Sequence, residues 1–390
     1  MKILFIHSYY QVYGGEDSVF QHELDLIRSS NQVRSFSMHN KPGVLGSMQF
    51  VLSIWNSFVA KRLKDEIIDF SPDVIHIHNL HYAIGPIAIR VANRMEVPIV
   101  YTLHNYRLLC PSGSLMNNGH LFTDSIKAYF PWKAVRNKVF RHSYILTFWL
   151  SFIGWFHRVI KTWALVDRYI VLTDFAKEVY VSSTLNVLPE KFVVKPNFVV
   201  DYNNESTKRG SHFLYVGRLS EEKGTEVLLS AFAQVGYTLQ IAGEGPLAGK
   251  VKRLSEGSEN IHYLGPLDRS AVLQAMQTCN ALIFPSIWYE GMPMVILEAL
   301  SLGTPVIASN FGAMASLISH KENGLHFTVN DSNDLVDKLH FWSKLKEEQK
   351  EVYRSNAIDS YKLNFTPQAN ETQLLTIYRS LVKKADLIQV

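Results

Sequence analysis

Residues 286–305 read SIWYEGMPMVILEALSLGTP. Pro293 suits the first turn of a helix, and Gly303 suits the position just past its end. Short apolar runs flank this stretch, with ALIFP directly before it and PVIAS overlapping its last proline. A strand, a helix and a second strand in this order form a βαβ unit, which predicts a parallel sheet.

The same alternation of short apolar runs with stretches of helical period extends over the whole chain. We expect strands at residues 3–7, 73–78, 99–103, 168–172, 192–195, 212–216, 239–242, 261–264, 281–285 and 305–309. The alternation stops over residues 196–210, where PNFVVDYNNESTKRG is typical of a linker. We therefore predict an α/β protein with a first domain of residues 1–200, a second of residues 201–366, and a terminal helix, 367–390, that packs back on the first.

The composition limits the class of protein. The chain has 390 residues, enough for two or three domains, and its 47% apolar and 19% charged residues are typical of a globular protein. The net charge of +4 is too small to indicate nucleic-acid binding, although residues 1–200 carry +7 and residues 201–390 carry −3. With only Cys110 and Cys279, we exclude a disulfide framework and expect a reducing compartment.

Two features of the first domain bear on location. The amino terminus, MKILFIHSYYQVYGG, lacks the long apolar region and the cleavage site of a secretory signal. The longest nearly uncharged apolar run covers residues 143–156, whereas a spanning helix needs roughly 20 residues. We therefore expect a cytoplasmic protein, which lies at most peripherally on the inner face of the cytoplasmic membrane.

Residues 127–168 have the composition of a membrane-surface segment. They hold eight Lys or Arg, a single acid (Asp167) and eleven aromatic residues, among them four of the seven tryptophans. An apolar stretch flanked by cations and Trp is typical of an interfacial helix on an anionic membrane surface. The alternative is a pair of core helices whose charges are merely solvated.

Two carboxylates of the quoted stretch form a candidate ligand site. Glu290 precedes the expected helix and Glu298 lies inside it, roughly 7–8 Å along the axis. A buried carboxylate needs a hydrogen-bond donor, and polyhydroxyl ligands supply such donors. The alternative is a helix whose acids are capping and solvated.

Two cations follow a strand of the second domain in VGRLSEEKG, residues 216–224. Arg218 leaves the strand end and Lys223 precedes a helix start, where parallel α/β sheets bind ligands. An Arg fork and a Lys point charge at a helix amino terminus suit a diphosphate. The alternative is two solvated charges beside Glu221 and Glu222.

Gly14 and Gly15 follow the first strand and open the first helix, so this backbone can approach a phosphate or a sugar closely. The GxGxxG spacing of a dinucleotide site is absent. Glu16 and Asp17 would compete with an anion at this helix end. An ordinary turn with acidic capping is the alternative.

Four histidines, His76, His78, His81 and His104, cluster near strand ends. A zinc site needs a tighter ligand set, and the alternation of His76 and His78 favours a packed strand face. The chain has no Asp-x-Asp motif, so we expect no metal clamp for a diphosphate. His104, directly after the strand of residues 99–103, is the best placed to contact a ligand.

Together these segments resemble the family 4 retaining glycosyltransferases, over nearly the whole chain. The resemblance rests on YGGEDSVF (13–20), DVIHIHN (73–79), TLHNYRLLCPSG (102–113), VKPNFV (194–199), VGRLSEEKG (216–224), IAGEGPL (241–247) and EGMPMVILE (290–298). It implies the GT-B fold, in which two Rossmann-like, doubly wound parallel-sheet domains face a central cleft. The GGED and HNYRLLCP pieces look like a subgroup associated with bacterial surface polysaccharide assembly.

The resemblance implies a donor-binding role for residues of the second domain. Arg218 and Lys223 would hold the donor diphosphate in place of a metal, so that no cofactor is needed. Glu298 would accept hydrogen bonds from the ribose, and Gly291 and Met292 would line the donor site.

The resemblance also implies residues close to the transferred sugar. Glu290 would contact its hydroxyls and stabilise an oxocarbenium-like state, and His104 would contact the same sugar. Gly14 and Gly15 would line the donor phosphate and the acceptor side. The anomeric configuration would be retained by front-face attack, which needs no nucleophile.

The sequence departs from the family at one place. Similar sequences often carry a Cys-x-x-Cys arrangement after the HNYRLLCP piece, whereas here LFTDS at residues 121–125 leaves Cys110 alone.

The resemblance implies a UDP-sugar or GDP-sugar donor and a polyprenyl-diphosphate-linked saccharide acceptor. A soluble transferase acting on a free sugar or sugar phosphate, and a non-catalytic nucleotide-sugar-binding module, remain as alternatives.

Overall fold

The computed structural model describes residues 1–202 and 208–388, with side chains up to residue 382. The chain divides into two compact units. Unit 1 comprises residues 1–117, 122–195 and 370–390, and unit 2 comprises residues 118–121 and 196–369. The division at 195/196 coincides with the start of the expected linker, of which residues 203–207 lie outside the described residues.

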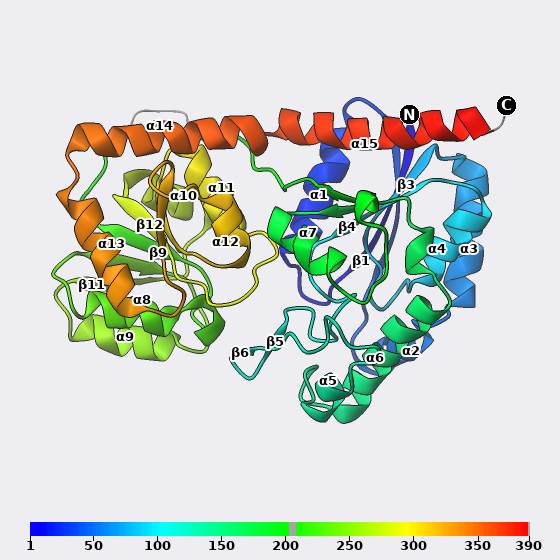
Figure 1. The fold of residues 1–390 in the computed structure, drawn as a ribbon, viewed down its shortest axis with the longest axis horizontal. Coiled ribbons are helices and arrows are strands. Elements are labelled where there is room, and N and C mark those ends of the chain that lie inside the picture. Colours follow the sequence, from blue (N-terminus) through cyan, green and yellow to red (C-terminus); the bar gives the residue numbers. More distant parts are fainter. Residues whose placement is uncertain (203–207, 389–390) are drawn as a thin grey trace. The chain divides into compact units, whose positions relative to one another are not determined.

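Unit 1 is built on a six-stranded parallel sheet. Its strand order is β2 (Gln32–His39), β1 (Lys2–Tyr9), β3 (Val74–Asn79), β4 (Ile99–Leu103), β7 (Arg168–Val171) and β8 (Phe192–Val194). The helices that accompany it are α1 (Gly15–Arg28), α3 (Ser57–Phe70), α4 (Ile87–Arg94) and α7 (Asp174–Val181). Strands β3 and β4 are buried along their whole length, because helices cover both faces of the sheet (Figure 1).

The last helix, α15 (Pro367–Ile388), packs on this sheet together with α1. Leu374 and Tyr378 are fully buried in the same apolar cluster as Phe5 and Phe20. The Tyr378 hydroxyl also lies 2.7 Å from Nδ1 of His76 on β3. These contacts explain why residues 370–390 belong to unit 1.

Unit 2 repeats the architecture. Its six parallel strands are ordered β11 (Ile261–Gly265), β10 (Leu239–Ala242), β9 (Phe213–Val216), β12 (Ala281–Phe284), β13 (Val306–Ser309) and β14 (Gly324–Phe327). Its helices are α8 (Thr225–Phe232), α9 (Ala248–Glu256), α10 (Arg269–Thr278), α11 (Met294–Ser301), α12 (Gly312–Leu317), α13 (Ser332–Lys344) and α14 (Glu347–Asn364). The predicted fold class, two parallel-sheet α/β domains, is confirmed.

Three helices of unit 1 stand apart from the strand and helix alternation: α2 (Gly43–Leu52), α5 (Trp132–Arg136) and α6 (Tyr144–Val159). Helix α6 buries one side, including Leu150 and Ile153, and exposes Ile145 on the other. The buried side agrees with the core-helix alternative for residues 127–168, and the membrane-surface interpretation stays a prediction. No single described helix is long and apolar enough to cross a membrane, and only α2 and α3, bent by 77°, meet that test as a pair.

Candidate functional site

A cavity of about 230 Å³ lies in unit 2 at the carboxyl ends of β9 and β12. The loops that follow the two strands and the first turn of α11 form its walls. Its lining residues are Tyr215, Val216, Gly217, Arg218, Lys223, Phe284, Pro285, Ser286, Glu290, Met292, Pro293, Met294 and Val295. The structure thus brings together Arg218, Lys223, Glu290 and Met292 of the sequence candidates.

The two loops approach each other closely at Gly224, the residue before α8. Its φ is +71°, and a Cβ atom there would lie 1.9 Å from the carbonyl oxygen of Pro285. Only glycine meets both conditions without strain. This contact places the loop that carries Lys223 against the end of β12.

A hydrogen-bonded ion pair occupies the floor of the cavity. Lys223 Nζ lies 2.7 Å from Oε1 of Glu290, and the Ser286 hydroxyl donates to the same oxygen at 2.8 Å. The Glu290 side chain is buried, whereas about a fifth of Lys223 is exposed. Both groups are therefore held in place, and the ammonium can still reach a ligand that enters the cavity.

Arg218 differs from Lys223 in being exposed. Its carbonyl oxygen accepts a hydrogen bond from the Tyr215 hydroxyl at 2.8 Å, which fixes the backbone of the loop. Among the side chains that the structure describes, up to residue 382 and without 203–207, no ion pair to its guanidinium is found. The cavity therefore has a free guanidinium at its rim in addition to the paired ammonium.

Of the remaining candidates of unit 2, Met292 lines the cavity, whereas Gly291 and Glu298 are not among its lining residues. Met292 is buried, and its sulfur accepts a hydrogen bond from the backbone N–H of Asn197 at 3.1 Å. Gly291, the residue before it, is half-buried. Glu298, farther along α11, does not line the cavity. It lies 3.4 Å from the guanidinium of Arg269, and burial raises its pKa against the influence of that cation.

In unit 1, Gly14 is the N-cap of α1 and Gly15 its first residue. The Gly14 amide already donates to Oδ2 of Asp17 at 2.9 Å, and His7 contacts the other oxygen of that carboxylate at 2.7 Å. Asp17 therefore caps the start of α1, as in the acidic-capping alternative. Nothing lies within 4 Å of a Cβ built at Gly15, so space for a ligand remains beside the helix start.

His104, half-buried after β4, is the end of a buried chain of polar groups. Its Nε2 lies 3.0 Å from Nδ1 of His78, and Nε2 of His78 lies 3.4 Å from Oε2 of Glu23. Burial alone would raise the pKa of Glu23, but the Lys195 ammonium and His78 hold that pKa well below its usual value. Glu23 is therefore an ionised carboxylate at neutral pH.

The Glu23 carboxylate favours one arrangement of the ring protons of His78 and His104. With the proton of His78 on Nε2, towards Glu23, its Nδ1 accepts a hydrogen bond from Nε2–H of His104. Burial lowers the pKa of His104 well below its usual value, so the ring is neutral. Nδ1 of His104 is then a lone-pair acceptor, which suits a ligand hydroxyl.

Glu23, His76 and His78 lie close enough together to hold a metal ion. However, the two ring nitrogens of His76 already contact the hydroxyls of Thr102 and Tyr378, each at 2.7 Å. Glu23 is hydrogen-bonded to Lys195. The packed strand face that the sequence favours is the better description of this cluster.

Comparison with known proteins identifies the class. Residues 21–201 match the family model described as Glycosyltransferase Family 4, and residues 202–359 match the model described as Glycosyl transferases group 1. The chain is a GT-B glycosyltransferase.

Two curated relatives support this identification. A Klebsiella pneumoniae "uncharacterized 42.6 kDa protein in cps region" is 22% identical over 312 residues, which cover 78% of this chain and 74% of the relative. The Escherichia coli "O-antigen chain mannosyltransferase C" is 27% identical over 217 residues, 52% of this chain and 58% of the relative.

The fold of the glycosyltransferase is also that of solved structures. The crystal structure of Anabaena Alr3699/HepE in complex with UDP and glucose has a TM-score of 0.68 at 19% identity, covering 97% of this chain and 100% of the other. At this identity the likeness concerns the fold.

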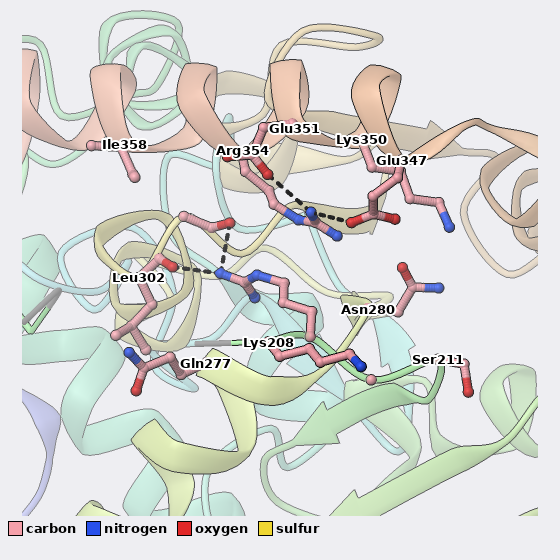
Figure 2. A pocket seen from close by; sticks show the side chains of 13 residues that line it. Lys208, Ser211, Gln277, Asn280, Leu302, Glu347, Lys350, Glu351, Arg354 and Ile358 are labelled. Carbon is pink, nitrogen blue, oxygen red and sulfur yellow. Dashed lines mark hydrogen bonds and ion pairs between the residues drawn. The ribbon is translucent and has the colours of Figure 1, made fainter. Parts of the chain in front are cut away.

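Unit 2 of the glycosyltransferase also has a larger hollow, of about 710 Å³. Figure 2 shows Arg354 between Glu347 and Glu351, to which it donates at 2.5 and 3.0 Å. Arg209 donates to the carbonyl oxygens of Leu302 and neighbouring residues. The two guanidinium groups are thus engaged in holding the fold.

Sequence reasoning missed several residues that hold the candidates in place: Ser286, Arg269, Glu23 and Lys195. For Glu23 a signal was present, because its position three and four residues from Phe20 and Ile27 places it on the apolar face of α1. An acid there requires a buried partner. The contact between Arg269 and Glu298 depends on the packing of α10 beside α11 and has no comparable signal.

Proposed function

We propose that the glycosyltransferase transfers a sugar, with retention of configuration, from a nucleotide-sugar donor whose nucleotide is UDP or GDP. The cavity in which Arg218, Lys223 and Glu290 meet carries this proposal. A guanidinium and an ammonium suit a diphosphate, and a carboxylate accepts hydrogen bonds from sugar hydroxyls. The UDP and glucose of the Alr3699/HepE complex support the assignment.

The proposed chemistry uses the groups of the cavity and no metal cofactor. The acceptor hydroxyl attacks the anomeric carbon on the face from which the diphosphate leaves, and a leaving phosphate oxygen takes its proton. Arg218 and Lys223 neutralise the departing diphosphate, and Glu290, held by Ser286, stabilises the positive charge on the sugar. Front-face attack retains the configuration.

The remaining candidates take supporting roles in this proposal. Glu298 would accept hydrogen bonds from the ribose, with Arg269 beside its carboxylate. Gly291 and Met292 would shape the donor site. In unit 1, Gly15 would leave room for the ligand beside Gly14.

For the acceptor we propose a saccharide linked to polyprenyl diphosphate, in the assembly of a bacterial surface polysaccharide. The relatives from a cps region and from O-antigen synthesis support this pathway. Such an acceptor places the enzyme on the inner face of the cytoplasmic membrane. A soluble transferase acting on a free sugar or sugar phosphate is the second candidate, favoured if short soluble acceptors are used as well as lipid-linked ones.

Incubation with a panel of UDP-sugars and GDP-sugars tests this function. We expect one donor to be consumed in the presence of a lipid-linked saccharide, with a product whose anomeric proton coupling in NMR matches that of the donor. An inverted product would overturn retention. Failure of every nucleotide diphosphate to bind would overturn the donor site.

The two cations proposed to hold the donor diphosphate, Arg218 and Lys223, form what we call the phosphate clamp, and they yield the first prediction. Arg218→Ala and Lys223→Ala each remove a charge-assisted contact, so we expect donor nucleotide binding to weaken by about 1.5–3 kcal/mol in each variant. Calorimetric titration with UDP and GDP measures this loss, and binding should survive EDTA. The exposed Lys252→Ala is the matched control. Unchanged affinity in the double variant would contradict the clamp.

The second prediction concerns His78 as a positioning residue. His78→Phe keeps a ring in place but removes the acceptor for His104, so we expect kcat to fall about 10-fold, the effect of losing one buried hydrogen bond. In the wild type, ¹⁵N NMR should show His104 protonated on Nε2. The exposed His120→Phe should change neither quantity. A wild-type His104 protonated on Nδ1 would overturn the tautomer assignment.

A further inference from the structure

Helix α2 presents an apolar surface to solvent. Its ten residues, GVLGSMQFVL, include no charged side chain, and none of them is buried. The exposed fractions are 78% for Val44, 56% for Leu45, 54% for Met48 and 55% for Val51. We call these four residues the α2 face. A helix in a soluble protein buries an apolar stripe, and a contiguous exposed patch marks an interaction surface.

Helix α2 contacts an aromatic surface of α5 and α6 through Phe50, which by helical periodicity lies on the side of α2 away from the α2 face. The Trp149 indole donates to the carbonyl oxygen of Phe50 at 3.0 Å, and the Phe50 ring stacks with Phe140 at 6.4 Å. Figure 1 shows α2 beside α6 and α5 in unit 1. Tyr144 and Ile145, at the start of α6, are 54% and 79% exposed. Exposed apolar side chains therefore occur on α6 as well as on α2.

The sequence segments that carry α2, α5 and α6 contain no acidic residue. Residues 26–64 and 127–166 contain no Asp or Glu. Lys138 lies 4.5 Å from the Tyr144 ring and Arg141 lies 5.5 Å from the Phe140 ring, so these cations border the aromatic surface. Lys133 is paired with Asp124, and no such ion pair is found for Lys138 or Arg141 in the described part of the chain.

We infer that α2 enters the interfacial layer of an anionic lipid bilayer, with the cations of residues 133–141 on the headgroups. Ten helical residues span about 15 Å, half of the roughly 30 Å hydrocarbon core, so α2 lies in the plane of the interface. A second copy of the chain is a poorer occupant, because it would bring like charges together. The inference rests on the proposed function, which puts the enzyme on the inner face of the membrane, and it names the surface that binds there; the binding itself requires neither donor nor transfer.

Flotation with vesicles of phosphatidylcholine, with and without phosphatidylglycerol, tests the inference. The wild-type chain should bind the anionic vesicles, and added salt should weaken binding. The triple variant Val44→Ser, Leu45→Ser, Met48→Ser should bind the anionic vesicles at least about tenfold more weakly than the wild type. Its matched control, Leu188→Ser, Val352→Ser, Leu363→Ser, removes three equally exposed apolar side chains elsewhere and should bind like the wild type.

A fluorescent label reports insertion directly. Cys110 and Cys279 are buried, so an environment-sensitive dye reacts selectively with Val44→Cys. Its emission should shift to the blue on anionic vesicles, and the emission of a dye at Leu363→Cys should not. An unshifted emission at position 44, or wild-type binding by the triple Ser variant, would overturn the inference. The inference would also be overturned if the wild type formed a dimer in solution and bound no vesicles, while the triple Ser variant was a monomer. Titration of the same variants with UDP and GDP measures nucleotide binding, so failure of the donor site is distinguished from failure of membrane binding.

Discussion

Glu290→Gln is expected to lower the turnover of sugar transfer by about 10²–10³-fold while nucleotide diphosphate binding is kept or becomes tighter. Glutamine preserves the size of the side chain and an oxygen that accepts from Ser286. It removes the negative charge that would face the developing cation, and losses of this order follow removal of a group that stabilises transition-state charge. It also releases Lys223 from its ion pair, which frees the ammonium for the diphosphate.

Separate measurements of kcat and of the nucleotide dissociation constant distinguish these effects. The control is Glu226→Gln, which breaks the surface ion pair with Lys250 on α9 and should leave both quantities unchanged. Turnover that persists while nucleotide binding collapses would assign Glu290 to the nucleotide instead of the sugar.

The core of both sheets could be predicted from the sequence because parallel strands covered on both faces are continuous apolar runs. Besides the two-residue strands β5 (Met116–Asn117) and β6 (His120–Leu121), two strands of the six-stranded sheets were missed. Strand β2, QVRSFSMH, lies at the edge of its sheet and buries only Phe36 among its eight residues. Strand β14, GLHF, is also at an edge and has four residues. Strand β2 lacks the apolar run on which the prediction depended, and the short run of β14 is interrupted by His326.

The candidate site could be predicted in part. Arg218 and Glu290 follow strands that prove to be neighbours, β9 and β12, so their loops meet at one sheet edge. The ion pair between Lys223 and Glu290 was not predictable, because it depends on the approach of the loops at Gly224. The exposure of α2 was equally hidden, since an uncharged apolar decapeptide is compatible with a buried helix. Only the packing of the rest of unit 1 shows that nothing described covers it.

The buried ion pair of unit 1 yields the prediction with the largest effect on stability. Lys195 and Glu23 are both almost fully buried, and the ammonium hydrogen-bonds to the carboxylate. Lys195→Met removes the cation and leaves the charge of Glu23 in an apolar setting beside His78. Breaking a buried pair in this way costs about 3–5 kcal/mol. We expect urea denaturation at pH 7 to show a loss of this size, and the exposed Lys64→Met to show almost none.

The pH dependence of this loss reveals its electrostatic origin. In the wild type the folded-state pKa of Glu23 is lowered, so the contribution of the pair is present at neutral pH and is lost as pH falls through that pKa. In Lys195→Met, burial without the cation raises the pKa of Glu23, so the ionised carboxylate destabilises the folded state instead of stabilising it. The folded state of the variant then gains stability as Glu23 is protonated, so the difference between the two proteins should shrink towards pH 4–5. The double variant Glu23→Gln, Lys195→Met should recover much of the loss at pH 7, because no charge remains buried. If the single variant were equally destabilised at every pH, lost packing of the lysine stem and not an uncompensated carboxylate would be the cause.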